Sequence, residues 1–351
     1  MKPPAEASST EAETVSRVHF AARLEDRIHR FRERRGRRRG LVPTIVPFPG
    51  YGGDGWLRVL GRAVLVKPGR RAPDRYTNIR GWRSFTSIPV RDAEIQVRVG
   101  DVEHVIHADR GGVIDARVEA QLAPGWGSAL LTLEGSDAIE QPVFVVADDV
   151  EFGLVSDIDD TVMVTALPHP FLAAWNTFVL GEHARRAVPG MAVLYDRLAG
   201  SHPGSPVIYL STGAWNIVPT FNRFLSRHLF PRGTFLLTDW GPTPERWFRS
   251  GQEHKKASLA RLAAEFPRVR WLLVGDDGQH DEERYREFVE SHPDSVAAVA
   301  IRELTPGEAV LAGGRSQREE HGSAAPWVYG VDGAELADSL TELGLLSTPR
   351  A

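Results

Sequence analysis

The chain has 351 residues, of which 42% are hydrophobic, so it can bury more than one hydrophobic core and is not globally disordered. It has no cysteine, which excludes disulfides, thiolate–zinc sites and cysteine nucleophiles. The formal net charge of −4 is unevenly distributed: residues 17–39 hold ten arginines and three acidic residues, a charge of +7, which leaves −11 for the rest of the chain.

Residues 1–40 predict a disordered start followed by a basic amphipathic helix. Apolar residues recur at steps of three and four, with arginines between them, at Val18, Ala21, Leu24, Ile28 and Phe31. Two interpretations stay open, namely a helix that docks on its own protein and a helix that contacts an anionic membrane. The acidic remainder of the chain argues against nucleic acid as a partner.

Two further absences bear on location. No apolar run approaches the roughly 18–20 residues that a membrane span needs. The first 13 residues are acidic and lack the apolar core of a secretory signal. We therefore expect a cytoplasmic protein, peripheral at the membrane if the basic helix binds lipid.

Residues 41–149 predict an antiparallel β-sandwich of about 100 residues. Six or seven short runs alternate apolar and polar residues, and Gly, Pro and Asp turns such as residues 49–55 and 109–112 separate them. The histidines of this segment, His104 and His107, are expected to face solvent or satisfy core contacts rather than bind metal. This domain is either a scaffold or a module that faces the substrate.

Residues 150–351 predict an α/β domain with a doubly wound, Rossmann-like parallel sheet of five strands and a C-terminal helix. Apolar runs at residues 152–157, 206–211, 234–239, 270–276 and 296–303 alternate with segments of helical periodicity. Ligands of such sheets bind beyond the carboxyl ends of the strands. The residues at those ends are therefore the candidates for function.

Three strand ends carry polar groups, and each has an ordinary explanation when it is taken alone. The run from Asp157 to Thr161 fails as a calcium loop, because Val162 and Pro168 replace the required Gly and Glu. Ser211 does not fit a nucleophile elbow, because Tyr209 replaces a required glycine. The aspartates that follow residue 275 could cap a helix, and Lys255 could be a surface lysine.

Taken together, these groups predict a phosphoryl-transfer site. Two acidic clusters at neighbouring strand ends form an oxygen-rich site suited to Mg²⁺, and a hydroxyl and an ammonium supply donors to a phosphoryl group. One carboxylate can attack phosphorus, and a second carboxylate two residues further on can protonate the leaving oxygen.

The order of the motifs resembles the haloacid-dehalogenase-like phosphatases. DxDxT, a strand-end Ser, Lys and GDD follow one another across about residues 150–305. Longer strings resemble the catalytic domain of the actin-patch-type phosphatidate phosphatases, namely SDIDDTVMVT, YLSTGAWN, HKKASLARLAAEFP and LLVGDDGQHDEERY. The preceding β-rich region resembles that of the bacterial members of the family.

The resemblance implies a role for each matched residue. Asp157 is the nucleophile and Asp159 the general acid/base, while Ser211 and Lys255 hold phosphoryl oxygens. Thr161 supports the loop and, with Thr212 and Gly213, lines the substrate site. Mg²⁺ is held by Asp157, the backbone carbonyl of Asp159 and Asp276.

Three points stay open within this resemblance. Asp281 is expected to act on the metal through water. Asp277 stands where a small polar residue is expected, so it is either a further metal ligand or a departure from the pattern. Lys256 is an alternative to Lys255, although the pair His254–Lys255 fits the family pattern better.

The spacing of the motifs leaves room for only a minimal cap. Between Thr161 and Ser211 there are about 50 residues. Residues 191–199 have helical periodicity and predict a helix, and the residues before them make a short flap. An open site suits a phosphate on a large or membrane-borne molecule. The flap residues Phe171, Trp175 and Phe178 could contact lipid or pack on the core.

The residues therefore predict a magnesium-dependent phosphomonoester phosphatase that acts through an aspartyl-phosphate. The resemblance implies phosphatidate-like lipid as the substrate, which would be converted to diacylglycerol and phosphate. Two alternatives remain. One is a phosphatase of phosphoproteins or nucleic-acid ends, and the other is a non-catalytic membrane or protein adaptor.

Overall fold

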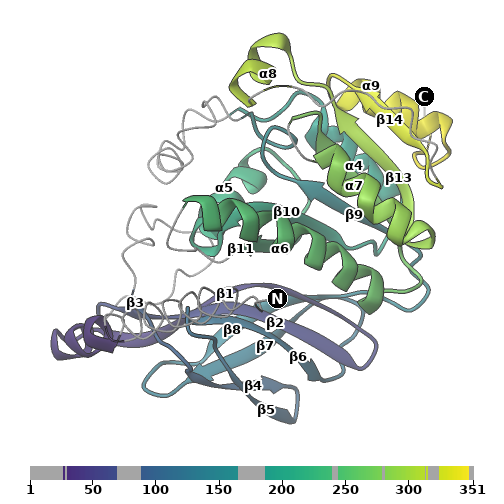
Figure 1. Cartoon of the computed structure of the whole chain (residues 1–351). Coiled ribbons are helices and arrows are strands. Elements are labelled where there is room, and N and C mark those ends of the chain that lie inside the picture. Colours follow the sequence, from purple (N-terminus) through teal and green to yellow (C-terminus); the bar gives the residue numbers. More distant parts are fainter. Residues whose placement is uncertain are drawn as a thin grey trace, which may run out of the picture.

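The computed structural model describes residues 27, 30–68, 88–164, 186–238, 244–278, 281–312, 314 and 324–347. These residues form a curled, mixed β-sheet followed by a parallel sheet with interleaved helices (Figure 1). The predicted fold class, an α/β domain preceded by a β-rich domain, is confirmed. Of the helices in the described residues, none has the length and apolar character that a membrane crossing requires.

The curled sheet, which we call the half-barrel, contains eight strands within the described residues. They are β1 (Val42–Gly53), β2 (Trp56–Val66), β3 (Ile88–Pro89), β4 (Glu94–Val99), β5 (Val102–His107), β6 (Val113–Glu119), β7 (Gly125–Leu133) and β8 (Ile139–Val145). Their order is β3-β2-β1-β8-β7-β4-β5, and β6 also pairs with β2. All pairs are antiparallel except β1 and β8.

The half-barrel differs in one respect from the predicted sandwich. Pairing is continuous from β2 to β5, so the strands form one sheet instead of two stacked sheets. The sheet curls until β5 approaches β6, where the His104 Nε2 atom and the carbonyl oxygen of Glu119 are hydrogen-bonded at 2.7 Å. Both architectures alternate inward apolar and outward polar residues, and only long-range pairing distinguishes them.

The first strand includes residues that the sequence suggests are a turn. Residues 49–53 continue β1, and the turn to β2 contains only Asp54 and Gly55, the latter with φ 77°. Prolines in β1 are tolerated because, within the described residues, the earlier part of the strand pairs on one side with β2, and β8 pairs with Gly50 to Gly52. A side chain at Gly50 would meet the backbone carbonyl of Arg58.

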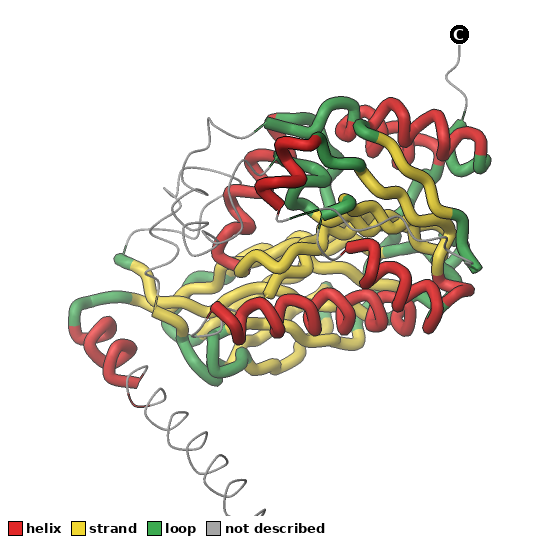
Figure 2. The backbone as a smooth tube through the Cα atoms, turned by 45° about the horizontal axis from the view of Figure 1, so that its top comes forward, coloured by secondary structure: helices red, strands yellow, loops and turns green. Residues whose placement is uncertain are grey.

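The basic N-terminal segment is described in part. Residues 30–38 are helical and lie at the end of the half-barrel (Figure 2), and Figure 1 shows this helix beside β3. Gly36 is buried against Leu65 of β2 and Ile88 of β3, so the end of this helix docks on the protein. The predicted helical residues before Arg27 lie outside the described residues.

The parallel sheet has six strands within the described residues, in the order β11-β10-β9-β12-β13-β14. They are β9 (Phe152–Asp157), β10 (Val207–Ala214), β11 (Thr234–Thr238), β12 (Arg270–Asp276), β13 (Val296–Arg302) and β14 (Trp327–Gly330). The helices between and after them are α4 (Met191–Ser201), α5 (Val218–Arg227), α6 (Pro244–Glu265), α7 (Asp281–Ser291), α8 (Pro306–Ala312) and α9 (Gly333–Glu342), with short 3₁₀ turns η2 (Trp215–Ile217) and η3 (Pro293–Ser295).

The chain winds outward from β9 in both directions. It first passes to β10 and β11, and then returns to β12 and continues to β13 and β14. Helices α6 and α7 contact each other on one face of the sheet, and α4 and α9 contact each other on the opposite face (Figure 1). The expected five strands are present, and β14 adds a sixth. With only four residues, β14 has too little sequence pattern to be recognised.

The two sheets share one hydrophobic core. Phe48, Tyr51 and Trp56 of the half-barrel belong to the same buried cluster as the strands of the parallel sheet. Phe48 stacks on Trp215 with ring centroids 4.9 Å apart. Thr234 Oγ1 donates to the carbonyl oxygen of Gly50 at 3.1 Å. The half-barrel is therefore packed directly against the α/β unit.

Candidate active site

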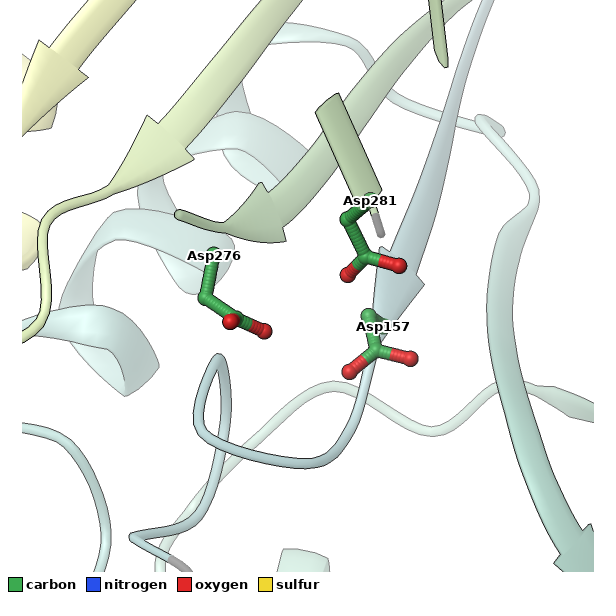
Figure 3. Close-up of side chains that lie close together, drawn as sticks. All are labelled: Asp157, Asp276 and Asp281. Carbon is green, nitrogen blue, oxygen red and sulfur yellow. The ribbon is translucent and has the colours of Figure 1, made fainter. Parts of the chain in front are cut away.

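The site lies at the topological switch point of the parallel sheet, between β9 and β12, where the order of successive strands reverses. Asp157 ends β9 and Asp276 ends β12, and these two strands are paired and parallel. Asp281 is the first residue of α7. All three side chains are buried, and one oxygen from each lies within 4.8 Å of the others (Figure 3). The switch point of a doubly wound sheet is the expected place for a ligand.

Lys255 of α6 provides the positive charge of the site. Its Nζ donates to Asp157 Oδ1 at 2.5 Å and to Asp281 Oδ1 at 2.8 Å. Arg284, one turn after Asp281 on α7, also donates to Asp281 Oδ1 at 3.2 Å. The neighbouring Lys256 points away, since its side chain is 67% exposed and pairs with Glu287. Lys255 is thus the lysine that reaches the carboxylates.

The turn after β12 is built around Asp276. Asp276 Oδ1 accepts from the backbone N–H of Gly278 at 2.7 Å, and its Oδ2 accepts from Thr161 Oγ1 at 3.3 Å. Gly275 is required here because a Cβ atom would lie 2.9 Å from Asp281 Oδ2 and 2.7 Å from the Tyr285 ring. The absent side chain lets α7 bring Asp281 close to the strand.

The strand-end serine and the second aspartate are also brought together. Ser211 Oγ donates to Asp159 Oδ2 at 3.2 Å and accepts from the N–H of Gly213 at 3.0 Å. Asp159 is half-buried, whereas Ser211 is buried. Thr238 Oγ1 donates to the carbonyl oxygens of Thr212 and Gly213, which fixes the last part of β10, where its pairing register with β11 shifts.

The carboxylates of the site carry more negative charge than its cations neutralise. Burial raises the pKa of Asp157, although Lys255 opposes the rise. Burial and the charge of Asp281 also raise the pKa of Asp276. Burial opposes ionisation of Asp281, but the ammonium of Lys255 and the guanidinium of Arg284 outweigh it and lower the pKa. The pKa of Lys255 is raised, because its two carboxylate partners outweigh burial.

This donor set fits a divalent cation. All the converging ligand atoms are carboxylate oxygens, which suit Mg²⁺ better than a thiophilic metal. Within the described residues, Asp281 Oδ2 is buried and has no hydrogen-bond partner. A buried, unpaired carboxylate oxygen is costly unless a cation or donor offsets it. The geometry and charge therefore support a site for a divalent cation.

Asp277 is placed differently from its neighbour. Its Oδ1 accepts from the backbone N–H of Leu304 at 2.8 Å, and its own N–H donates to the carbonyl oxygen of Arg302. Among the described residues, it is not one of the three carboxylates that converge. The predicted flap residues Phe171, Trp175 and Phe178 lie outside the described residues.

One residue that supports the site is missed by the sequence reasoning. Arg302 is buried at the end of β13, where its Nη1 donates to the carbonyl oxygen of Asp160 at 2.7 Å. Its Nη2 donates to both oxygens of Glu308 on α8 at 2.9 Å. Asp160 has φ 56°, so this anchor holds the loop after β9 in a left-handed turn. Arg302 lies near the end of the fifth predicted strand, residues 296–303. Inspecting the carboxyl end of that strand, as was done for the others, would have found it.

Comparison with known proteins identifies the segment that holds these residues. Residues 152–303 match the family model described as the catalytic domain of phosphatidate phosphatase APP1. Over 152 residues the chain is 25% identical to phosphatidate phosphatase APP1 of Saccharomyces cerevisiae, covering 43% of this chain and 25% of the yeast protein. Over 160 residues it is 21% identical to an uncharacterized protein of Schizosaccharomyces pombe, covering 45% of this chain and 26% of that protein.

The matched segment spans about a quarter of the length of each of these curated relatives. Among solved structures, a carbohydrate acetylesterase from Xanthomonas citri aligns with 86% of this chain and 74% of its own, at 11% identity. Its TM-score is 0.30, which is too low to support a conclusion about fold or function.

Proposed function

Because residues 152–303 belong to the catalytic domain family of the APP1-type phosphatidate phosphatases, we propose that this protein is a magnesium-dependent phosphomonoester phosphatase that acts on phosphatidate-like lipids. The observation that carries the proposal is the convergence of three buried carboxylates with the ammonium of Lys255 at the switch point of the sheet. The products would be diacylglycerol and inorganic phosphate.

The proposed reaction has two steps. An oxygen of Asp157 attacks phosphorus, the bond from phosphorus to the leaving oxygen breaks, and Asp159 donates a proton to that oxygen. Water then attacks the phosphorus of the aspartyl-phosphate while Asp159 takes up a proton, which releases phosphate and restores the Asp157 carboxylate. Ser211 of β10 donates a hydrogen bond to Asp159, so this serine could orient both the acid and the phosphoryl group.

We propose Asp157 and Asp276 as cation ligands from the converging oxygens, and the backbone carbonyl of Asp159 from the resemblance of the motifs. Asp157 and Asp276, with the backbone carbonyl of Asp159, would hold Mg²⁺, and Asp281 would support it from beside Lys255. Bound Mg²⁺ would neutralise the charge that the carboxylates share with the substrate phosphate. Lys255 would bind a phosphoryl oxygen, and Thr161, Thr212 and Gly213 would shape the substrate side. We assign Asp277 to support of the turn after β13.

An aryl phosphate assay tests the chemistry. Purified protein should release phosphate in the presence of Mg²⁺ and lose that activity in EDTA. The variant Asp157→Asn should be inactive, whereas Asp101→Asn, an equal change at an exposed turn, should behave as wild type. Equal activity in Asp157→Asn and wild type would rule out the proposed nucleophile.

The lipid substrate is a separate part of the proposal. We place the protein in the cytoplasm, in peripheral contact with anionic membrane through residues 30–39, where all seven arginines are exposed. Each basic residue near an anionic surface contributes about 1 kcal/mol of attraction. Phosphatidate in phosphatidylcholine vesicles should therefore be a better substrate than soluble sugar phosphates, phosphopeptides or nucleic-acid end phosphates. A preference for any of the latter would reject the lipid assignment.

A further inference from the structure

Helix α6 lies between the two sheets and presents a different face to each (Figures 1 and 2). Leu259 and Leu262 belong to the core of the parallel sheet. Arg261 and Glu265 are four residues apart, so they lie on one side of the helix, and both contact the half-barrel. Because Lys255 extends from the same helix, contacts that hold α6 also decide where its ammonium lies.

Four charged residues of alternating sign connect α6 to the half-barrel. Glu265 accepts from Arg58 Nε at 3.1 Å and also contacts Arg58 Nη2. Arg58 Nη1 donates to Asp115 Oδ1 at 2.6 Å, and Arg261 Nη1 donates to Asp115 Oδ2 at 2.7 Å. The side chains of Arg58 and Glu265 are only 14% and 7% exposed, so their pairing is not a solvated surface contact. We call these four residues the interface charge chain.

An aromatic cluster holds the same end of the helix. Phe266, the residue after α6, packs against Tyr51 and Trp56 of the half-barrel, with ring centroids 5.8 Å and 5.4 Å apart. On its other side, Phe266 contacts Trp271 of β12 at 6.0 Å. The Tyr51 hydroxyl donates to Glu265 at 2.7 Å, and burial raises the pKa of Tyr51, so the donor keeps its proton. The interface charge chain and the rings together restrain the rotation and the axial position of α6.

We propose that the half-barrel is a positioning element of the active site, and that the interface charge chain sets the position of α6 so that Lys255 meets Asp157 and Asp281. The two carboxylates come from β9 and α7, not from α6, so a shift of the helix would separate them from Lys255. The family match begins at residue 152, so Arg58 and Asp115 lie outside the matched catalytic segment. For its kinetic consequence, this inference rests on the proposed phosphatase function.

The variant Glu265→Gln tests the proposal because it keeps the side-chain shape and removes the charge. With the aryl phosphate and saturating Mg²⁺, kcat should fall by about 10-fold to 100-fold, since small misplacements of catalytic groups have effects of that size. KM should change less than kcat. The control is Asp148→Asn, which breaks the exposed Asp148–Arg268 pair between the same two parts of the chain and should leave kcat unchanged.

Amide hydrogen exchange gives a readout that does not depend on activity. In Glu265→Gln, backbone amides of residues 253–258 should exchange faster than in wild type, and in Asp148→Asn they should not. If Glu265→Gln does not fold, Asp115→Asn is the milder variant, because Asp115 is 32% exposed. A lower Tm with unchanged kcat and unchanged exchange at residues 253–258 would overturn the proposal. The interface charge chain would then stabilise the interface without positioning Lys255. An inactive wild-type protein would count against the proposed function, while the exchange experiment would still test the positioning.

Discussion

Replacing Lys255 by Met tests whether the acidic cluster depends on a buried ammonium. Lys255 is 4% exposed, and both of its ion-pair partners, Asp157 and Asp281, are buried. Removing one partner of a buried ion pair costs about 3–5 kcal/mol, because the remaining charge is left without compensation. For a folded unit of about 150–250 residues, such as the α/β unit, that loss of stability corresponds to a fall in Tm of roughly 6–20 °C.

The measurement is thermal unfolding by circular dichroism in EDTA, repeated with Mg²⁺. Lys255→Met should lose stability mainly in EDTA, and Mg²⁺ should raise its Tm more than it raises the Tm of wild type, because the cation then compensates carboxylates that Lys255 no longer neutralises. In the presence of Mg²⁺, where wild type is expected to be active, Lys255→Met should also lose phosphatase activity if Lys255 binds the phosphoryl group.

The neighbouring lysine provides the matched control. Lys256 is exposed and forms a surface ion pair with Glu287, so Lys256→Met should leave the Tm and the activity unchanged. A Tm of Lys255→Met in EDTA that equals or exceeds that of wild type would refute the ion-pair reasoning. A smaller Mg²⁺-induced shift than in wild type would refute the idea that Lys255 and the cation compensate the same carboxylates.

Three further predictions follow from the site and its supports. Burial raises the pKa values of Asp157 and Asp276, so at these two carboxyls the metal-free folded protein binds more protons than the unfolded chain. Burial also lowers the pKa of His254 to about 4, which has the opposite effect on stability at acid pH, so the test range is pH 7 to 8. Over that range the Tm in EDTA should fall as pH rises, while Mg²⁺-induced stabilisation grows, and a Tm in EDTA that rises would contradict this. Arg302→Met should destabilise the protein by about 1–3 kcal/mol in a denaturant titration, because the loop carbonyl and Glu308 lose their donor, and it should lower kcat; wild-type kcat would argue against the loop anchor. Gly275→Ala should weaken Mg²⁺ affinity measured by calorimetry, because its Cβ would collide with Asp281, whereas Gly200→Ala, which meets nothing within 4 Å, should not.

Local pattern in the sequence was sufficient for the elements of the α/β unit and for most of the site. Buried strands alternate with amphipathic helices, and this alternation predicts a parallel sheet whose strand ends converge. The predicted helix over residues 191–199 is α4, and the strand ending at residue 276 is β12. Asp157 and Asp276 were candidates because they end predicted strands, a position that periodicity defines. Asp281 and Lys255 were candidates because they match the order of the family motifs, and Lys255 lies in the middle of α6.

Tertiary structure decided which of two neighbouring residues reaches the site. Asp276 and Asp277 are adjacent at a strand end, yet one joins the carboxylate cluster and the other accepts from Leu304. Likewise Lys255 is buried among carboxylates, while Lys256 is exposed, because the rotation of α6 sets which of them faces the sheet. Spacing along the chain places both members of each pair near the site and does not give their orientation.

The difference between local pattern and tertiary contact also explains why the strands of the β-rich segment were predicted and their pairing was not. Alternation of apolar and polar residues identifies its strands but not their partners, so the parallel pairing of β1 with β8 and the curl of one continuous sheet were not predictable. The contacts of Arg58 with Glu265 and of Arg261 with Asp115 join residues 207 and 146 positions apart. Such pairs leave no periodic trace, because they form only when two independently patterned elements pack together.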